Sequence, residues 1–401
     1  MFYLIFVDTM SEIKYNNKKY LGLNSLTNGG FVMEKSKVYW TDMHAKMGSN
    51  LLQKLERLVK EAGIGNIDFK NKFAAIKINF GEPGNMSYIR PNYAKVVADV
   101  VRSLGGEPFL TDSNTLYVGR RKHALEHMTA AYENGFTPMT TGCHIIIADG
   151  LKGTDEVKVP IDGELVKEAK IGAAIMNADV FISLSHFKGH EQAGFGGAIK
   201  NIGMGSGSRA GKMEMHSDIN PRVSERKCVG CRICSKICAH GAISYENNKA
   251  HIHEDKCLGC GRCIGVCNFD AIKPVYEISI ESFNKKMAEY AWAVVKDRPT
   301  FHINLLMDVS PFCDCHAEND IPLIPSVGMF ASFDPVALDK ACADVANKQP
   351  IIHGSAIDNA ECSHKEDHFA AMHPATDWMG CLKHAEKIGM GSLEYELIEV
   401  K

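Results

Sequence analysis

KCVGCRICSKICAHGAI stands at residues 227–243, and KCLGCGRCIGVCNFDAI stands at residues 256–272. Each stretch places four cysteines in the spacing C-x2-C-x2-C-x3-C, and the second follows the first with a period of 29 residues. One loop that carries three such closely spaced thiolates can bind three irons of a single iron-sulfur cube, while the fourth cysteine binds an iron of a second cube. The doubled motif therefore predicts two [4Fe-4S] clusters.

The predicted clusters share their ligands between the two stretches. The first cluster is expected to use Cys228, Cys231, Cys234 and Cys267. The second cluster is expected to use Cys257, Cys260, Cys263 and Cys238. Gly230, Gly259 and Gly261 suit loops whose backbone N–H groups turn toward the sulfides. A pair of structural zinc sites is the alternative, but zinc domains usually take two cysteines from each of two separated knuckles.

The cysteine stretches closely resemble those of bacterial two-cluster ferredoxins. The resemblance implies two low-potential centres that transfer electrons, held in a small α+β ferredoxin-like module over residues 217–277 with repeats at 219–248 and 249–277. Ferredoxins have proline after the fourth cysteine, whereas this chain has Ala239 and Asn268. Proline shapes the turn without binding iron, so these substitutions affect the expected potential more than the expected ligation.

The composition of the chain narrows its class. The 401 residues include 45 basic and 48 acidic side chains, and the net charge of -3 predicts neither nucleic acid nor an anionic membrane as a partner. No apolar run is long enough to span a bilayer, and the opening MFYLIFVDTM lacks the basic start of a signal peptide. Fourteen cysteines in such a chain indicate metal or redox chemistry in the cytoplasm rather than a disulfide framework.

Strand and helix patterns alternate on both sides of the cysteine block. The apolar runs that read as strands lie at residues 74–80, 144–149, 179–185 and 300–309. The patterns that predict helices lie at residues 51–62, 93–104, 120–134, 168–178, 281–297 and 334–347. Strands that are apolar on both faces and alternate with helices predict an α/β fold, with a mainly parallel sheet covered by helices on both faces.

The cysteine block interrupts this pattern, which then resumes. We therefore expect one α/β domain in two parts, at residues 33–216 and 278–401, with the module at 217–277 inserted between them. Separate domains in series are the alternative. Residues 1–32 end in the loop-like run NSLTNGG, and Met33 opens a segment typical of the start of a domain. We interpret residues 1–32 as an N-terminal extension.

A glycine-rich segment, HFKGHEQAGFGGAIKNIGMGSGSRAGKMEMH, occupies residues 186–216. Its glycines allow backbone N–H groups to approach a ligand, and its basic side chains supply positive charge, so the segment suits a small anion. The residues predicted to bind this ligand are Gly194, Gly196, Gly197, Lys200, Arg209 and Lys212. The segment also follows a predicted strand, where ligands of parallel sheets bind. A flexible connection into the cysteine block is the alternative.

A second group of cysteines follows the predicted strand at residues 300–309. Two thiols and an imidazole stand together at Cys313, Cys315 and His316. They have the chemistry to hold an additional metal, and the histidines that could complete such a site are His186, His190 and His216. Buried, inert cysteines are the alternative. The single cysteines Cys143, Cys342, Cys362 and Cys381 are expected to be structural.

Polar residues follow two other predicted strands. They are Lys77, Glu82, Asn85 and Arg90 after the first, and Asp112 and Asn114 after the second. Because the carboxyl ends of parallel strands meet at one edge of a sheet, these side chains are candidates for a shared ligand crevice. Ordinary turn chemistry explains the same residues equally well.

Several motifs together resemble one family, the uncharacterised Fe-S centre proteins, in which a ferredoxin module interrupts the domain of unknown function 362. The motifs are KINFGEPGN, LTDSNTLYVGRR, HFKGHEQAGFGGAIKNIGMG, the doubled cysteine motif, PFCDCHAENDIPLIPSVGMFASFDPVALDKAC and HPATDWMGCLKHAEKIGMGS. The resemblance covers residues 33–400 and implies an α/β domain whose activity is unknown.

Three functions fit these patterns. The first is an iron-sulfur oxidoreductase that relays electrons between a redox partner protein and a ligand on the α/β domain, in an anaerobic setting. The second is a ferredoxin-like carrier or docking partner without catalysis. In the third, the clusters are structural or sense the redox state.

Overall fold

The computed structural model describes residues 35–401, except for residues 118, 217–219, 276–277 and 359–365. The predicted N-terminal extension, residues 1–32, and the predicted structural cysteine at position 362 lie outside the described residues. The predicted inserted module is described from residue 220 onward.

The central sheet is mainly parallel, as predicted. In the described part of the chain it has eight strands in the order β16-β1-β15-β14-β7-β2-β3-β4. Every neighbouring pair is parallel except the two pairs that contain β15. The strands are β1 (Ser36–Asp42), β2 (Phe73–Lys77), β3 (Glu107–Asp112), β4 (Ile145–Ile147), β7 (Val180–His186), β14 (Thr300–Leu306), β15 (Gly328–Ser332) and β16 (Tyr395–Glu399).

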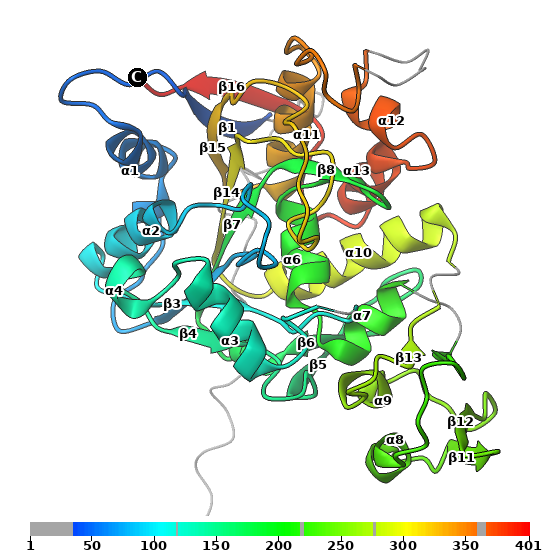
Figure 1. Ribbon diagram of the computed structural model, residues 1–401. Helices are drawn as coiled ribbons and strands as arrows, with labels where there is room; N and C mark the ends of the chain where they lie inside the picture. The colour runs from blue at the N-terminus through cyan, green and yellow to red at the C-terminus, as the bar shows by residue number, and fades with distance from the viewer. Residues whose placement is uncertain (1–34, 118, 217–219, 276–277, 359–365) are drawn as a thin grey trace, which may run out of the picture.

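Helices cover both faces of this sheet, which confirms the α/β fold class (Figure 1). One face carries α1 (Leu51–Glu61), α2 (Pro91–Ser103), α3 (Ala124–Glu133) and α4 (Pro138–Thr141). The other carries α6 (Ala198–Ser206), α10 (Ile280–Val295), α11 (Pro335–Ala346) and α13 (Trp378–Lys387). The short η2 (Ile64–Asn66) follows α1, and α12 (His368–Met372) precedes α13.

The side chains of each strand alternate between two hydrophobic cores. Phe181 of β7 packs into the core under α6 and α10, whereas Val180 and Ile182 pack into the core under α1 and α2. Because both faces are covered, all seven residues of β7 are buried, and its consecutive residues Val180, Phe181 and Ile182 are all apolar. This explains the continuous apolar run in the sequence.

The chain reverses its direction of travel across the sheet between β2 and β7. From β2 it moves outward through β3 to β4, and it then returns to place β7 on the other side of β2. A hairpin of β5 (Glu156–Pro160) and β6 (Glu168–Gly172), followed by the short α5 (Ala173–Met176), makes this return. Such a reversal leaves a crevice at the carboxyl ends of the two strands.

The connection between the neighbouring parallel strands β7 and β14 contains the whole cysteine block. It begins with the hairpin of β8 (Lys188–His190) and β9 (Gly194–Gly196), continues through α6 and α7 (Arg209–His216), and returns along α10. The central sheet therefore takes strands from both sides of the block.

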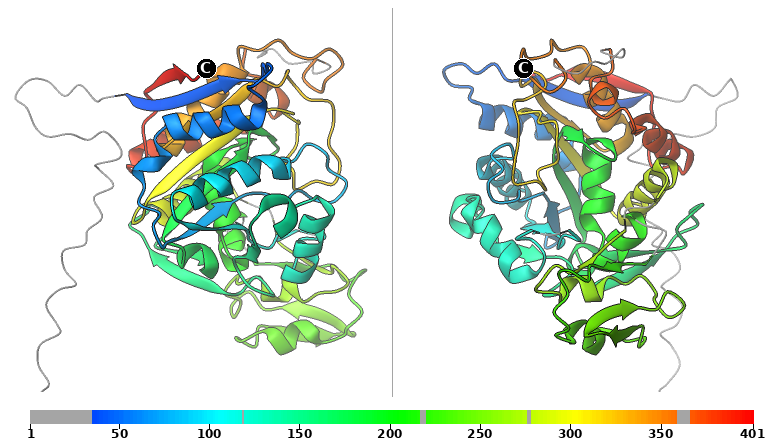
Figure 2. Two further views of the ribbon diagram at one scale, coloured as in Figure 1. Left: turned by 90° about the vertical axis from the view of Figure 1, so that its left-hand side faces the viewer. Right: turned by 45° about the vertical axis from the view of Figure 1, so that its right-hand side comes forward.

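Residues 220–275 project from the sheet domain as a small unit, which we call the cysteine lobe (Figure 2). Two antiparallel strand pairs form its framework: β10 (Arg222–Val223) pairs with β13 (Ile272–Lys273) from the other end of the lobe, and β11 (Ile243–Glu246) forms a hairpin with β12 (Lys249–Ile252). The short α8 (Ile233–Ile237) and α9 (Arg262–Gly265) each contain the third cysteine of one motif. The lobe packs on α7, where Met213 joins its small core.

The structure corrects one local prediction and excludes one alternative. The helix expected at residues 168–178 is instead strand β6 followed by the single turn α5, because EAKIG pairs along its length with β5. The glycine-rich segment is also not a flexible connection, because it forms β8, β9, α6 and α7.

Candidate functional site

A cavity of about 750 Å³ lies at the crevice between β2 and β7. Lys77 from the end of β2 and Ser185 and His186 from the end of β7 line it, together with Asp112 from the end of β3. Its opposite wall is formed by the cysteine lobe, through residues that include Ile264. The cavity thus lies between the sheet and the lobe.

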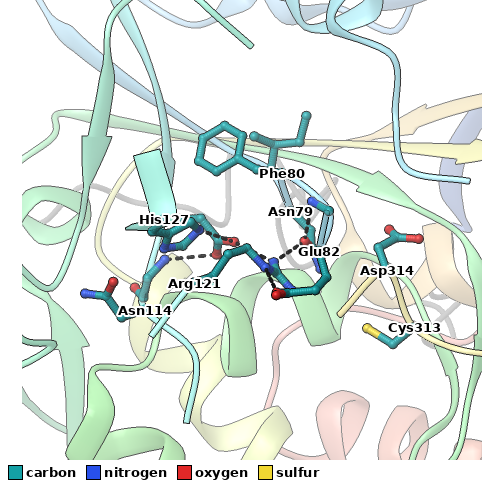
Figure 3. Close-up of polar contacts among 12 residues, drawn as sticks. Asn79, Phe80, Glu82, Asn114, Arg121, His127, Cys313 and Asp314 are labelled. Atoms are coloured by element: carbon teal, nitrogen blue, oxygen red, sulfur yellow. Dashed lines mark hydrogen bonds and ion pairs between the residues drawn. The ribbon is translucent and has the colours of Figure 1, made fainter. Parts of the chain in front are cut away.

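Buried ion pairs stabilise the sheet side of the cavity. Lys77 Nζ lies 2.8 Å from Asp112 Oδ1, and Arg121 Nε lies 2.9 Å from Glu82 Oε2. Figure 3 shows Arg121 between His127 and Glu82. Burial raises the pKa of Asp112, but Lys77 and His127 outweigh burial and lower it overall. Burial lowers the pKa of Lys77, which the nearby Asp112 carboxylate partly offsets.

Three of the six polar residues predicted at strand ends meet at this cavity: Lys77, Glu82 and Asp112. The other three are engaged elsewhere in the fold. Their partners are Asp308 for Arg90, Asp149 for Asn114, and the carbonyl oxygen of His316 for Asn85. The shared crevice therefore involves only half of the predicted set.

The glycine-rich segment contributes part of the cavity wall. Gly197, Lys200 and Lys212 line the cavity, as expected for a ligand-binding segment. Gly194 and Gly196 belong instead to β9, where they pair with β8. The predicted set is thus divided between the cavity and the hairpin beside it.

Arg209 is committed to the junction between the sheet domain and the cysteine lobe. Its guanidinium donates to the carbonyl oxygens of Lys152 at 3.1 Å and Thr115 at 3.3 Å, and also to that of Lys122. A Cβ atom added to Gly265 of the lobe would lie 2.7 Å from Arg209 Nε, so the guanidinium packs closely against the backbone of the lobe here. Arg209 therefore holds the junction and does not face the cavity.

Lys122 makes a second link across the same junction. Its Nζ donates to the carbonyl oxygen of Cys267 at 3.0 Å and pairs with the Asp270 carboxylate. Both partners belong to the second cysteine motif. The lobe is thus fixed to the sheet domain through the backbone that follows its last cysteine.

Cys313 lies on the cavity beside a buried ammonium group. The Nζ atom of Lys200 lies 3.2 Å from Cys313 Sγ, and the Cys313 side chain is 1% exposed. The neighbouring Cys315 thiol, together with Lys200 and Lys188, stabilises the thiolate form and lowers the pKa of Cys313 well below its usual value, although burial opposes this. The interaction with Cys313 raises the pKa of Cys315.

The loop that carries these cysteines is held firmly. His186 contacts two acceptors, with Nδ1 2.8 Å from Asp314 Oδ1 and Nε2 2.8 Å from the carbonyl oxygen of Met307. The carbonyl oxygen of Asp314 accepts from the backbone N–H of Glu82 at 2.8 Å. Both ring nitrogens of His186 are therefore occupied by interactions within the protein.

The other candidate histidines also line the cavity. His190 Nδ1 accepts from two backbone N–H groups at 3.1 Å, those of Gln192 and Ala193. His316 Nε2 lies 3.2 Å from Glu191 Oε1, and His216 Nδ1 bonds a carbonyl oxygen of its own helix. The structure thus brings His190, His216 and His316 to the cavity that Cys313 and Cys315 line.

The eight motif cysteines separate into two groups of four within the lobe. Each group surrounds a small cavity. The first cavity is lined by Cys228, Cys231, Cys234 and Cys267. The second is lined by Cys238, Cys257, Cys260 and Cys263. Each small cavity is thus lined by three cysteines of one motif and the fourth cysteine of the other, and the predicted ligand sets stay a prediction.

The backbone around the two groups follows the 29-residue period. Gly230 and Gly259 have φ values of 68° and 65°, and Arg232 and Gly261 have values of 65° and 64°. Backbone N–H groups also point at cysteine sulfurs: that of Ala242 lies 3.3 Å from Cys238 Sγ, and that of Ala271 lies 3.3 Å from Cys267 Sγ. N–H groups so placed are what stabilise anionic thiolates around iron-sulfur clusters.

Among the described residues, no three His, Cys, Asp or Glu side chains converge as the ligands of one metal ion would. A cubane cluster makes a different geometric demand, because its four thiolates bind four separate irons. The metal site predicted around Cys313, Cys315 and His316 stays a prediction.

Several cavity residues were not foreseen as functional. Arg121 and Tyr117 line the cavity from the segment that follows β3, and Glu191 lines it from the turn between β8 and β9. A search extended to every polar residue within ten positions of a strand end would have found Arg121, which bonds the Tyr117 hydroxyl at 3.1 Å. The same search would have found Glu191, which lies five positions after the end of β7.

In the described portion of the chain, every helix is too short or too polar to cross a bilayer.

The chain is 27% identical over 157 residues to a thylakoid-associated protein of Synechocystis sp., an alignment that covers 38% of this chain and 45% of that protein. The chain therefore matches less than half the length of this curated relative.

Two solved structures have limited similarity to the fold. The lactate racemase apoprotein from Thermoanaerobacterium thermosaccharolyticum aligns with a TM-score of 0.32 and 11% identity, over 68% of this chain and 51% of that chain. A structural-genomics protein from Thermotoga maritima aligns with a TM-score of 0.39 and 12% identity, over 73% of this chain and 57% of that chain.

A family profile covers most of the site. The profile described as Domain of unknown function (DUF362) matches residues 74–344. This range contains β2, β7 and β14, the cysteine lobe, and the loop with Cys313 and Cys315. Because the match spans more than half of the chain, this protein belongs to the DUF362 family.

Proposed function

We propose that this protein is an iron-sulfur oxidoreductase, in which the cysteine lobe holds two [4Fe-4S] clusters and an anionic ligand binds in the cavity beside it. One observation supports this proposal most: the lobe and the sheet build the wall of a single cavity. Ile264, which directly follows Cys263, faces the same space as Lys200 and Cys313. A ligand there would lie next to the loops that bind the clusters.

The lobe suits cubane clusters in three respects. Four cysteines surround each small cavity, the left-handed backbone positions recur with the period of the motif, and backbone N–H groups point at the sulfurs. When bound, such clusters supply one-electron transfer at low potential. The residues of the chain position the sulfurs and set the polarity around them.

The cavity wall favours an anion. Of its described lining residues, seven are lysine or arginine and five are aspartate or glutamate. Lys200 bonds a sulfur, and Lys212 bonds the carbonyl oxygen of Gly207 at 2.6 Å, rather than a carboxylate. Burial lowers the pKa of Lys212 to about 8. An anion near its Nζ atom would favour the charged form, so binding and protonation would reinforce one another.

The lobe also presents apolar side chains next to the cluster loops. Val229 and Leu258 each follow the first cysteine of a motif and are 50% and 71% exposed, and Phe269 is 45% exposed. Exposed apolar side chains next to cluster ligands are suited to contact with a redox partner protein. The same surface supports the second candidate function, an electron carrier that docks other proteins without catalysis.

None of the described cysteines forms a disulfide, which fits the reducing cytoplasm and an anaerobic setting.

Metal and sulfide analysis tests the proposal directly. The full chain purified without oxygen should contain about eight irons and eight acid-labile sulfides, and dithionite should produce the EPR signal of a reduced cubane. A Cys228→Ser/Cys257→Ser variant should lose most of this iron, whereas a Cys143→Ser/Cys381→Ser variant, altered away from the lobe, should retain it. Stoichiometric zinc, or clusters that no reductant can reduce, would contradict the electron-transfer role.

Ligand binding needs a separate experiment. Inorganic phosphate serves as the probe anion, and its dissociation constant is measured by calorimetry on the iron-loaded protein. Lys200→Ala/Lys212→Ala should weaken binding at least about tenfold, since each buried charge-assisted bond contributes about 1.5 to 3 kcal/mol. The control is Lys60→Ala, which alters an exposed lysine on α1. Equal affinity in all three proteins would exclude an anion site at these lysines.

A further inference from the structure

Cys313 and Cys315 differ from the other cysteines outside the lobe. Cys342 and Cys381 pack in the hydrophobic core under α11 and α13, and Cys143 packs in the opposite core. Cys313 and Cys315 instead line the large cavity, one residue apart, and a lysine ammonium lies 3.2 Å from Cys313 Sγ. Core cysteines are inert because they are not accessible to a reactant. Cys313 and Cys315 both face a space that a reactant can enter.

The backbone before and within the pair is fixed. The carbonyl oxygen of Pro311 lies 2.8 Å from His373 Nε2, and a Cβ atom on Gly189 would lie 2.3 Å from that same oxygen. Between the two cysteines, Asp314 is held by His186 and by the N–H of Glu82. The two thiols therefore project into the cavity from a loop whose position is determined by the surrounding structure.

We propose that Cys313 and Cys315 form a two-electron dithiol/disulfide couple that exchanges electrons with the ligand in the cavity. In the reducing direction the Cys313–Cys315 S–S bond breaks, and two electrons and one proton enter. The products are the Cys313 thiolate beside Lys200 and the Cys315 thiol. In the reverse direction, the S–S bond forms again as two electrons and one proton pass to an oxidised ligand, such as a disulfide or another two-electron acceptor.

The position of the pair provides a source of electrons. Ile264 and Asp270, which adjoin the two cysteine groups of the lobe, line the same cavity as the dithiol. Two one-electron donors next to a two-electron couple would supply the required pair of electrons one at a time. For this source alone, the inference rests on the proposed function; the thiol chemistry of Cys313 and Cys315 stands independently of it.

The sequence makes the couple easy to observe. Trypsin cleaves after lysine and arginine but not before Pro299, and it yields one peptide, residues 297–340, in which Cys313 and Cys315 are the only cysteines. The full iron-loaded chain is equilibrated without oxygen in mixtures of reduced and oxidised dithiothreitol, quenched in acid and alkylated. As the mixture becomes more oxidising, we expect the peptide to change from two alkyl groups to none in a single two-electron transition. The form without alkyl groups should be lighter by two hydrogens than the unalkylated dithiol peptide.

Matched variants complete this experiment. Cys313→Ser and Cys315→Ser should each retain one alkyl group under all conditions, while Cys143, Cys342 and Cys381 should remain reduced in every protein. Two alkyl groups on the peptide throughout the titration would overturn the proposal. A metal bound to both thiols and blocking their alkylation in the native protein would overturn it as well.

A second reductant separates this inference from the proposed function. Photoreduced deazaflavin, a one-electron donor, should open the disulfide in the iron-loaded protein but not in a Cys257→Ser/Cys260→Ser variant, whereas dithiothreitol should open it in both. If dithiothreitol alone is effective and iron is absent from the parent protein, the dithiol couple stands and the electron-transfer proposal fails. If deazaflavin reduces the clusters but the disulfide stays closed, the proposed link between them is wrong.

Discussion

At the scale of single residues, a charged side chain is informative when its partners are known. Lys200 and Arg209 look alike in the sequence, because both stand in the glycine-rich segment. In the structure Lys200 faces a thiol in the cavity, whereas Arg209 is saturated by backbone carbonyl oxygens at the lobe junction. Sequence spacing could not separate these roles, because the difference depends on the loops after β3 and β4, which lie far away in the chain.

The local charge around Cys313 predicts its reactivity. Because Cys315, Lys200 and Lys188 lower the pKa of Cys313, its thiolate should already be present at neutral pH. Alkylation of reduced protein by iodoacetamide should therefore proceed at nearly the same rate at Cys313 from pH 7 to pH 9, while the rate at Cys315 rises over that range. Lys200→Met should slow Cys313 alkylation at pH 7 about tenfold, and Lys200→Arg should largely restore it.

Peptide mass spectrometry at short reaction times reads both rates in one sample. A Cys313 rate that climbs with pH as steeply as that of Cys315 would mean that the thiolate is not stabilised. An unchanged rate in Lys200→Met would remove the lysine from this role.

At the scale of elements, prediction succeeded where a local signal agreed with the packing. The helix expected at residues 51–62 forms as α1, with a capping box in which Asn50 and Gln53 satisfy each other's backbone N–H groups. The helix expected at residues 334–347 forms as α11, which is capped by Asp334. Helices α6 and α7 of the glycine-rich segment were not foreseen, because their helical state depends on contacts with α10 and not on intrinsic propensity.

Close packing between α6 and α10 explains one of those glycines. A Cβ atom at Gly203 would lie 2.3 Å from the carbonyl oxygen of Met287. Gly203→Ala should therefore destabilise the protein by about 1 to 3 kcal/mol, because the two helices must separate. The matched control is Gly65→Ala, where the nearest atom lies 4.0 Å away, and it should change stability by less than about 0.5 kcal/mol. Urea titration of both variants gives the comparison, and equal midpoints would argue against the close packing.

At the scale of the whole molecule, buried histidines predict sensitivity to acid. Burial lowers the pKa of His302 to about 3 and that of His216 to about 4. In the unfolded chain these groups bind protons near pH 6.5, so the unfolded state binds more protons below that value. Stability is therefore fully present above about pH 6.5 and falls as the pH decreases toward the folded values.

Replacing His302 tests this dependence. Between pH 6.5 and pH 5 the unfolding free energy of His302→Asn should fall less steeply than that of the parent. The two slopes should differ by at most about 1.4 kcal/mol per pH unit, the effect of one proton. His353→Asn, at an exposed position, should leave the slope unchanged. Urea midpoints at several pH values provide the measurement, and parallel slopes for the parent and His302→Asn would show that His302 does not cause the loss.

The outline of the whole molecule was predictable, but the shape of its cavity was not. Alternating apolar runs predicted the sheet and its covered faces, and the period of the cysteine motif predicted how the eight thiols divide. The meeting of the lobe with Lys200 and Cys313 depends on how the lobe docks. Lys122 contributes to that docking through the Cys267 carbonyl oxygen and the Asp270 carboxylate, and Arg209 contributes by packing its side chain against Gly265, so the pairing is not apparent from either sequence segment alone.

The place of the lobe between β7 and β14 has a consequence for the order of folding. These strands are neighbours in the sheet, yet their pairing must close the whole stretch between His186 and Thr300. Inside the lobe, Arg222 pairs with Lys273, so a lobe that is already folded brings its own two ends together. This roughly halves the free chain to be closed and saves about 0.6 kcal/mol of chain entropy. A lobe that folds before the sheet is complete would therefore speed the pairing of β7 with β14, and the proposed clusters would add to this effect by holding the lobe together.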